Sequence, residues 1–403
     1  MAMKVLMVNK FLYPNGGSET YIFSLGRELE RRGCEVQYFG MEHEGRIVGN
    51  HAECYTSNMD FHTGKLQRLL YPFKIIYSVE ARRKIRTVLE EFQPDVIHLN
   101  NFNFQLTPSI IYGINQYRKG SKKKVKLIMT AHDGQFVCPN HLMRNPVSGE
   151  RCTKCMDKGV IHCIKGRCIH GSLVKSVLAA IENRIYYRLR TYGHIDQIIC
   201  PSYFLRDKLK TYLPIADRLI VLHNFVEGFS DGDQKKEERG YVLYFGRYSE
   251  EKGIETLLGA CRQLPDIPFV FAGDGPLREQ VRRLPNIEER GFQTGKALEE
   301  LIRGARFCVM PSECYENCPF SVIEAQVCHT PVLGARLGGI PELLQEGVTG
   351  ELFEGGNLKE LTEKIDKLWK DKEKTETYSQ NCEKLQFDTA ESYCEKLLKI
   401  YEE

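Results

Sequence analysis

Short apolar runs alternate with amphipathic segments along most of the chain. Runs such as Lys4–Asn9 (KVLMVN) and Asp95–Leu99 are largely apolar, which is typical of parallel strands buried on both faces. The segment Ser18–Arg32 instead repeats its apolar residues at helical spacing. This alternation predicts an α/β fold built on doubly wound parallel sheets, whose ligands bind at the carboxyl ends of the strands.

The predicted elements form two series separated by the polar stretch Gly228–Gly240. The first series continues with Cys34–Phe39, Ala81–Glu91, Pro108–Tyr117, Lys126–Ala131, Ile195–Cys200, Tyr203–Tyr212 and Leu219–Leu222. The second has strands at Tyr241–Phe245, Phe269–Ala272, Ile287–Arg290, Phe307–Pro311, Pro331–Ala335 and Gly350–Phe353, with helices between them. We therefore predict two Rossmann-like domains, residues 1–224 and 225–384, that face each other across a cleft. A C-terminal helix at about 385–403 is expected to pack back on the first domain.

Length and charge favour the same division. A chain of 403 residues is too long for a single core. Through Asn224 it has 33 Lys and Arg against 19 Asp and Glu, and the remainder has 23 against 34. The basic half suits an anionic membrane surface, a phosphorylated acceptor or a nucleic acid. Because no apolar run reaches the roughly 18 residues of a membrane span and Met1–Phe11 lacks a signal-peptide core, we expect a cytoplasmic protein with reduced thiols.

The most informative block runs from Pro311 to Ala325 (PSECYENCPFSVIEA). Glu316 is predicted to lie in a loop, and Glu324 in the second turn of a helix that begins after Pro319. Free N–H groups in the first turn of such a helix attract an anion, and a nearby carboxylate can hold a hydroxyl. An anion together with a polyol indicates a nucleotide sugar. Solvated glutamates on an ordinary helix are the alternative.

Two other loops that follow predicted strands carry residues suited to phosphate. Arg247 and Lys252, in GRYSEEKG, can meet two phosphate groups as a bidentate fork and a point charge, with ordinary surface charge as the alternative. Gly16 and Gly17, in NGGSE, allow a close backbone approach at a helix N-terminus. The alternative there is a tight turn capped by Ser18.

Other strand ends carry a histidine and several glycines. His132, in TAHD, is expected to lie in the site, and Asp133 either orients its imidazole or binds a hydroxyl. His98 is deeper in its strand, where a structural role is at least as well supported. Three further residues in turns after strands could approach a ligand or border a base-binding pocket, although an ordinary loop is the favoured alternative when each turn is taken alone: Gly273, Gly291 and Phe292.

Together these motifs resemble the retaining glycosyltransferases of family 4, which have the two-domain GT-B architecture. The resemblance covers nearly the whole chain. It rests on GGSE, TAHD followed by Cys138-Pro139, PSYFLRDKL, LHN at Asn224, GRYSEEKG, GDGP and the block from Pro311 to Phe353. The second half is the more specific. The chain departs from the pattern at Phe225, where family members often have glycine.

The resemblance implies roles for these residues. Arg247 and Lys252 would bind the donor diphosphate and stabilise its charge during transfer. Glu324 would hold the donor ribose, and Glu316 would contact the donor sugar near its reacting face. His132 would lie near the reacting sugar. The remaining implied donor contacts are Gly16, Gly17, Asn317, Cys318, Pro319 and Phe320.

The resemblance also implies the reaction. A sugar would pass from a nucleotide donor, UDP by family frequency, to a glycan or lipid-linked acceptor in surface polysaccharide or glycolipid biosynthesis. Retention is explained by front-face attack within an ion pair, in which the leaving diphosphate takes the acceptor's proton, and no catalytic metal is expected. The alternatives are a GT-B phosphorylase or a nucleotide-sugar epimerase. A metal-containing nucleic-acid-binding module is more remote, because it leaves Glu316, Glu324, Arg247 and Lys252 unexplained.

Five cysteines gather in residues 138–170, a polar segment that we predict to be loop-like. The spacing C-x2-C-x7-C-x4-C of Cys152, Cys155, Cys163 and Cys168 predicts a structural zinc site, with Cys138 as a substitute ligand. Free thiols, or a disulfide formed on oxidation, are the alternative.

Two basic segments, Arg118–Lys126 and Lys65–Arg86, suggest peripheral attachment to the anionic inner face of the cell membrane. Lys65–Arg86 also carries interspersed Leu, Ile, Tyr and Phe residues, as expected of an amphipathic segment. A solvated charged face is the alternative for both.

Overall fold

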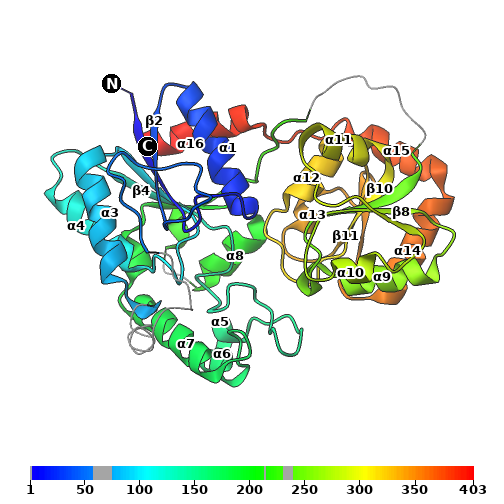
Figure 1. Ribbon diagram of the computed structural model, residues 1–403, viewed down its shortest axis with the longest axis horizontal. Helices are drawn as coiled ribbons and strands as arrows, with labels where there is room; N and C mark the ends of the chain where they lie inside the picture. The colour runs from blue at the N-terminus through cyan, green and yellow to red at the C-terminus, as the bar shows by residue number, and fades with distance from the viewer. Residues whose placement is uncertain (1, 58–74, 213–214, 230–238) are drawn as a thin grey trace. The chain divides into compact units, whose positions relative to one another are not determined.

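The computed structural model describes residues 2–57, 75–212, 215–229 and 239–403 (Figure 1). The chain divides into two compact units, Met1–Leu222 with Ala390–Glu403 and His223–Thr389. The first boundary lies two residues before the one expected from the sequence, and the second lies five residues after it. Contacts with the second unit account for both shifts. The Asn224 side-chain amide donates to the Cys318 carbonyl at 2.7 Å, and Val226 pairs with Thr389. Much of the basic segment Lys65–Arg86 lies outside the described residues.

The first unit is built on a six-stranded sheet in the order β2-β1-β3-β4-β5-β6, with every pairing parallel. Its strands are β1 (Lys4–Val8), β2 (Glu35–Phe39), β3 (Val96–Leu99), β4 (Lys126–Thr130), β5 (Gln197–Cys200) and β6 (Leu219–Val221). Its helices are α1 (Gly17–Arg31), α3 (Val79–Phe92), α4 (Ser109–Gly120), α5 (Lys154–Lys158), α6 (Ile161–Lys165), α7 (Leu173–Arg188), α8 (Tyr203–Tyr212) and α16 (Ala390–Glu402), with 3-10 turns η1 (Thr191–His194) and η2 (Ala216–Arg218). The central strands are almost entirely buried, which explains their largely apolar sequence.

The second unit has its own six-stranded parallel sheet, in the order β12-β11-β10-β7-β8-β9. Its strands are β7 (Tyr241–Phe245), β8 (Phe269–Ala272), β9 (Ile287–Glu289), β10 (Ala305–Met310), β11 (Val332–Ala335) and β12 (Gly350–Phe353). Its helices are α9 (Ile254–Gln263), α10 (Arg278–Val281), α11 (Gly295–Gly304), α12 (Phe320–Val327), α13 (Ile340–Leu343), α14 (Leu358–Lys370) and α15 (Lys372–Cys382), with the 3-10 turn η3 (Glu250–Lys252).

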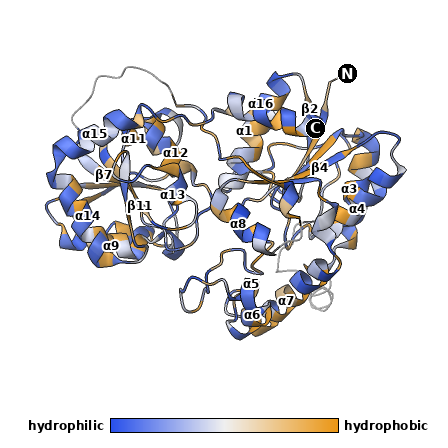
Figure 2. Cartoon of the chain, turned by 180° about the vertical axis from the view of Figure 1, so that it is seen from behind, coloured by the Kyte–Doolittle hydropathy of each residue, from blue (hydrophilic) through white to orange (hydrophobic). Residues whose placement is uncertain are grey.

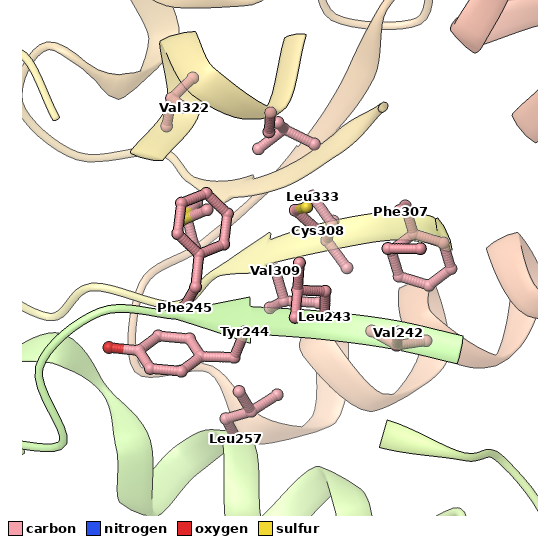
Figure 3. Close-up of a cluster of buried hydrophobic side chains, with 14 of the residues drawn as sticks. Val242, Leu243, Tyr244, Phe245, Leu257, Phe307, Cys308, Val309, Val322 and Leu333 are labelled. Atoms are coloured by element: carbon pink, nitrogen blue, oxygen red, sulfur yellow. The ribbon is translucent and has the colours of Figure 1, made fainter. Parts of the chain in front are cut away.

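The core of the second unit lies between its sheet and the covering helices. Figure 3 shows side chains of the adjacent strands β7 and β10 packed together, with Leu257 of α9 beside one of them and Val322 of α12 in the same cluster. Leu243, Val309 and Leu257 are fully buried. This packing fixes the two central strands, and therefore the loops that leave their carboxyl ends.

The last helix, α16, belongs to the first unit and packs against α1. Arg32, just after α1, reaches Glu395 of α16 at 3.1 Å. The Lys126 ammonium of β4 donates to the Ile400 carbonyl. Charged and polar contacts thus hold the end of the chain against the first sheet.

Residues 138–190 contain more helix than the sequence predicts. The segment expected to be loop-like holds the short helices α5 and α6, and α7 was not predicted at all. Apolar residues lie on both sides of α7, with Ala179 and Tyr186 buried and Val174 and Ile185 exposed. A helix without one clear apolar stripe gives no simple periodic signal.

Candidate functional site

Neighbouring strands of the second sheet, β7 and β10, mark the point where the strand order reverses. From β7 the chain continues to β8 and β9 on one side, and β10 to β12 lie on the other side. In open α/β sheets, ligands bind outside the carboxyl ends of strands at this switch point. The loop after β7 carries Arg247 and Lys252, and the loop after β10 carries Glu316.

An ion pair joins these two loops. The Lys252 ammonium lies 2.6 Å from Glu316 Oε1, and the Ser312 hydroxyl donates to the same oxygen at 2.7 Å. The Glu316 side chain is only 13% exposed. Burial acts to raise its pKa, but Lys252 and the hydroxyl outweigh this and hold the pKa below the ordinary value. Burial likewise acts against the Lys252 charge, yet Glu316 raises the lysine pKa. Both groups therefore stay charged.

The backbone locks the two loops together. Gly253, directly after Lys252, has φ 72°, and a Cβ there would lie 1.9 Å from the Pro311 carbonyl oxygen. The amides of Glu313 and Cys314 both donate to the Glu251 carbonyl, at 3.0 and 3.2 Å. Glycine is required at position 253 for both its conformation and its space.

Arg247 and the start of α12 present positive groups in this unit. Arg247 is exposed, and within the described residues its guanidinium has no acidic partner. The N-cap of α12, Pro319, makes no side-chain hydrogen bond to the helix. Free N–H groups of a first turn favour an anion, so these two features suit phosphate oxygens.

Glu324 lies in the second turn of α12, as predicted, and is half-buried. Burial raises the pKa of its carboxyl to about 7. Among the described residues, no side chain donates a hydrogen bond to this carboxyl. Glu324 and Glu316 are therefore unlike, since one carboxylate is already paired and the other is free to accept hydroxyl groups.

Residues around the predicted donor contacts Asn317–Phe320 shape this loop. Cys318 is buried, and its backbone carbonyl accepts a hydrogen bond from the Asn224 side-chain amide. The ring of Phe320 meets Phe225 edge-on, with centroids 6.3 Å apart. The departure from the family pattern at Phe225 thus serves packing within the second unit.

The turns after β8 and β9 adjoin the loop after β7. A Cβ on Gly273 would lie 1.9 Å from the Gly246 carbonyl oxygen, and the Gly273 amide donates to the Gly291 carbonyl at 2.8 Å. Next in the chain, Phe292 is 76% exposed. An aromatic ring open to this extent is available to stack against a base.

In the first unit, His132 follows β4 and its Nε2 lies 2.9 Å from the Asn100 side-chain oxygen. Its ring packs edge-on against Tyr21, with centroids 4.8 Å apart. Burial lowers the pKa of His132 to about 4, so the imidazole is neutral near pH 7. The sequence analysis did not identify Asn100, which directly follows β3, as a partner of His132. Its amide side chain directly after a buried strand was the signal that could have indicated it.

Asp133 does not orient His132, contrary to one of the two expectations. Its carboxylate lies 3.4 Å from Nδ1 of His141 and accepts the Gln135 amide. The Asp133 pKa is lowered because His141 and this amide outweigh its burial. Phe104 stacks on the His141 ring at 4.8 Å.

Beneath His132, a buried hydrogen-bonded network joins the sheet to the C-terminal helix. His98 contacts the Thr130 hydroxyl at 2.8 Å and the Tyr401 hydroxyl at 2.6 Å. Tyr21 in turn lies 3.1 Å from Thr130 and 2.9 Å from Tyr393. Burial lowers the pKa of His98 to about 3. His98 is therefore a structural residue in this network.

The NGGSE turn opens α1, which begins at Gly17 with Gly16 as its N-cap. Ser18 does not cap the helix, because its hydroxyl donates to Glu19 Oε1 at 2.9 Å. Asn9, at the end of β1, donates to the same oxygen at 2.8 Å. Gly16 and Gly17 are exposed, which leaves the helix start open to a ligand.

The five cysteines of the insert line one small cavity. All are free thiols. Within the described residues, no group of three or more His, Cys, Asp or Glu side chains is placed so that it could hold a metal ion. No helix of the described residues is long and apolar enough to cross a membrane.

Known proteins share both the sequence and the fold. Residues 15–227 match the model "Glycosyltransferase Family 4", and residues 225–385 match "Glycosyl transferases group 1". An uncharacterized glycosyltransferase of Methanocaldococcus jannaschii is 26% identical over 77% of this chain and 84% of its own. The N-acetyl-alpha-D-glucosaminyl L-malate synthase of Bacillus anthracis is 22% identical over 97% of this chain and 94% of its own.

Solved structures share the two-domain fold. Anabaena HepE in complex with UDP and glucose has a TM-score of 0.67 at 18% identity, with 99% of each chain covered. Sucrose-phosphate synthase from Thermosynechococcus elongatus has a TM-score of 0.71 at 16% identity, over 99% of this chain and 98% of its own. The GT-B architecture expected from the sequence is thereby confirmed, and the chain belongs to glycosyltransferase family 4.

Proposed function

We propose that this protein transfers a sugar, with retention of anomeric configuration, from a UDP-sugar to a glycan or lipid-linked acceptor. The observation that supports donor binding is the ion pair between Lys252 and Glu316 at the switch point of the second sheet. The same unit also exposes Arg247. The UDP preference draws on HepE, whose structures contain UDP and UDP-glucose. The site needs no catalytic divalent metal in this proposal.

Each group has a distinct task. Lys252 and Arg247 bind the diphosphate, and Glu324 accepts hydrogen bonds from the ribose hydroxyls. Glu316 both holds the Lys252 ammonium in place and contacts the donor sugar. The exposed ring of Phe292 stacks on the base.

The reaction proceeds by front-face attack. The bond between the anomeric carbon and the diphosphate oxygen breaks, and the acceptor oxygen bonds to the same face of that carbon. The departing diphosphate takes the acceptor's proton. Lys252 and Arg247 stabilise the negative charge that grows on the diphosphate. Neutral His132 hydrogen-bonds a sugar hydroxyl.

The acceptor is reached at an anionic membrane surface, through the exposed face of α7. Val174, Ile181, Ile185 and Leu189 recur at helical spacing and are 67%, 42%, 37% and 59% exposed. Figure 2 shows hydrophobic residues along this helix. Residues 154–190 contain eight Lys and Arg against two acidic residues. An apolar stripe with flanking cations is the composition of an interfacial helix.

Donor choice is tested by the thermal stability of the purified protein with UDP, GDP and ADP sugars. UDP-sugars should raise the melting temperature, and Lys252→Ala should abolish the rise. The configuration of the product, read by NMR, tests retention. Exchange of the donor with free phosphate, or its isomerisation without acceptor, would instead identify a phosphorylase or an epimerase.

Membrane docking is tested by flotation with vesicles of phosphatidylglycerol and phosphatidylcholine at low salt. The wild type should float with them, but not with phosphatidylcholine alone. Ile181→Asp with Ile185→Asp should remain unbound, whereas the control Val79→Asp, at a 70% exposed position on α3, should still float. If the wild type fails to bind, α7 is not a membrane-docking surface. That result does not bear on the proposal for donor binding.

A further inference from the structure

The segment that leads the chain into the second unit lies directly against the loop before α12. The Asn224 side-chain amide donates to the Cys318 carbonyl at 2.7 Å, and the Asn224 backbone N–H donates to Cys318 Sγ at 3.2 Å. Both residues are buried. Asn224 therefore holds Cys318 through two hydrogen bonds, although 94 residues separate them in the sequence.

The carbonyl that Asn224 holds belongs to the peptide bond that leads into α12. This bond joins Cys318 to Pro319, the N-cap of the helix. Because proline has no N–H, a hydrogen bond can fix this peptide only through its carbonyl. The free N–H groups of the first turn follow directly, so the orientation of this peptide influences the direction in which they point. Asn224 thus acts on the start of α12.

Neighbouring contacts fix the loop on both sides of that peptide. On the N-terminal side, the Glu316 carbonyl accepts a hydrogen bond from the Gly339 amide at 2.8 Å. On the C-terminal side, the ring of Phe320 meets Phe225, the residue after Asn224. The loop is therefore anchored at three points, and residues 224 and 225 supply two of them.

The segment that carries Asn224 is itself held in place, as an anchor must be. The Val226 amide donates to the Asp388 carbonyl at 2.8 Å, and Val226 pairs with Thr389. His223 and Thr389 are the first and last residues of the second unit. Residues 224–226 therefore connect the loop before α12 to the place where the chain leaves this unit.

The side chain of Asn224 uses only one end of its amide. Two oxygens do not approach to 2.7 Å without a hydrogen between them, so the NH2 group faces the Cys318 carbonyl. The Asn224 side-chain oxygen is buried, and within the described residues it has no hydrogen-bond partner. A buried acceptor without a partner lowers stability. A role in positioning the loop explains why the amide is present in spite of that cost.

We propose that Asn224 is a positioning residue for glycosyl transfer, which holds the Cys318–Pro319 peptide so that the first turn of α12 meets the donor diphosphate. This role rests on the proposed donor site, because it requires the diphosphate to bind at that turn. Asn224 acts through the backbone of the loop and not on the reacting atoms.

The test compares, by calorimetry, the affinity of the full-length protein for UDP and for uridine, which lacks the diphosphate. Asn224→Leu is similar in shape but cannot donate a hydrogen bond. Its UDP affinity should fall about 10-fold, while its uridine affinity stays within about 2-fold of the wild type. Asn224→Ala should give the same result. The control Asn286→Ala removes an amide that donates to three backbone carbonyls before β9, and it should keep both affinities even where it lowers stability.

The outcomes separate this role from the donor site. Equal UDP affinity in the wild type and Asn224→Leu overturns the role and leaves the donor site standing. An equal loss of UDP and uridine affinity also overturns it, because general damage to the unit would then explain the result. A wild type that binds UDP no better than uridine refutes the donor site, and the role of Asn224 with it.

Hydrogen exchange in the wild type provides a measurement that needs no variant. UDP, but not uridine, should slow exchange in residues 223–226 as well as in residues 316–323, because hydrogen bonds join the two segments. Slower exchange confined to residues 316–323 would overturn the role of Asn224.

Discussion

In the loops after β7 and β10, Lys252 and Glu316 keep each other charged, whereas within β3 and directly after β4 burial keeps His98 and His132 neutral. The two regions are alike in topology, since each belongs to central strands of a six-stranded parallel sheet or to the loops that follow them. The difference lies in the partners. An opposite charge 2.6 Å away offsets the cost of burial for Lys252, while His132 faces the neutral amide of Asn100.

This contrast gives each unit a different ligand preference. A charged loop with an exposed arginine suits a diphosphate, whose negative charge grows during transfer. Neutral hydrogen-bonding groups suit the uncharged hydroxyls of a sugar. The charged loops of the second unit and the neutral groups of the first unit thus differ in the kind of ligand group that each favours.

The largest expected effect comes from removing the charge at the second sheet. Lys252→Ala should lower turnover by about 100-fold or more, or roughly 3 kcal/mol of lost charge stabilisation. Initial rates at saturating donor measure this, with Lys359→Ala on the exposed face of α14 as the control. Near-normal turnover in Lys252→Ala would exclude a role at the diphosphate.

A smaller effect should follow from Glu324→Gln, which leaves the shape of the side chain unchanged. Loss of charged hydrogen bonds to ribose should weaken UDP binding by about 10-fold or more. Because the pKa of Glu324 is about 7, wild-type affinity should fall as pH drops below 7 and the carboxylate gains its proton. Calorimetry at several pH values should find much less of this fall in Glu324→Gln. An equal fall in both proteins would assign the titration to another group.

Tyr401→Phe should act on stability alone. It removes the hydroxyl that lies 2.6 Å from His98 and leaves a buried ring nitrogen without that partner, at a cost of about 1–3 kcal/mol. Denaturant unfolding measures the loss, with Tyr187→Phe at an exposed position of α7 as the reference. Unchanged stability would show that the network under β4 contributes nothing.

The smallest effect is expected in the pH profile of His132. With a pKa of about 4, this residue stays neutral between about pH 5.5 and 8. The pH dependence of kcat/KM should therefore have the same shape in wild type and His132→Gln over that range, although the variant is slower. A limb near pH 6.5 that disappears in the variant would show that His132 titrates during catalysis.

Much of the fold could be predicted from the order of elements. Buried parallel strands are apolar along most of their length, so Lys4–Val8 or Tyr241–Phe245 can be recognised without knowing their neighbours. Helix α7 could not be predicted, because it shows apolar residues on both sides and lacks a single stripe. The sequence does not show which of the apolar residues of α7 face the core, and that knowledge is needed to identify the others as an exposed apolar face.

The candidate site was predicted in part. The loops after β7 and β10 were identified from glycines and charges, but the bond between Lys252 and Glu316 was not, since 64 residues separate them. Asp133 was expected either to orient its neighbour His132 or to bind a hydroxyl, yet it pairs with His141. Proximity along the chain is a poor guide where a loop folds back on itself.

The sequence alone determined the family, the two-sheet architecture and the loops that carry the chemistry, because periodicity and local motifs are properties of short segments. Only the tertiary structure decided which groups stay charged and which become neutral, because burial and partners depend on contacts between distant segments. It likewise separated Glu316 from Glu324, two carboxylates eight positions apart, into one that is paired with a lysine and one whose pKa is about 7.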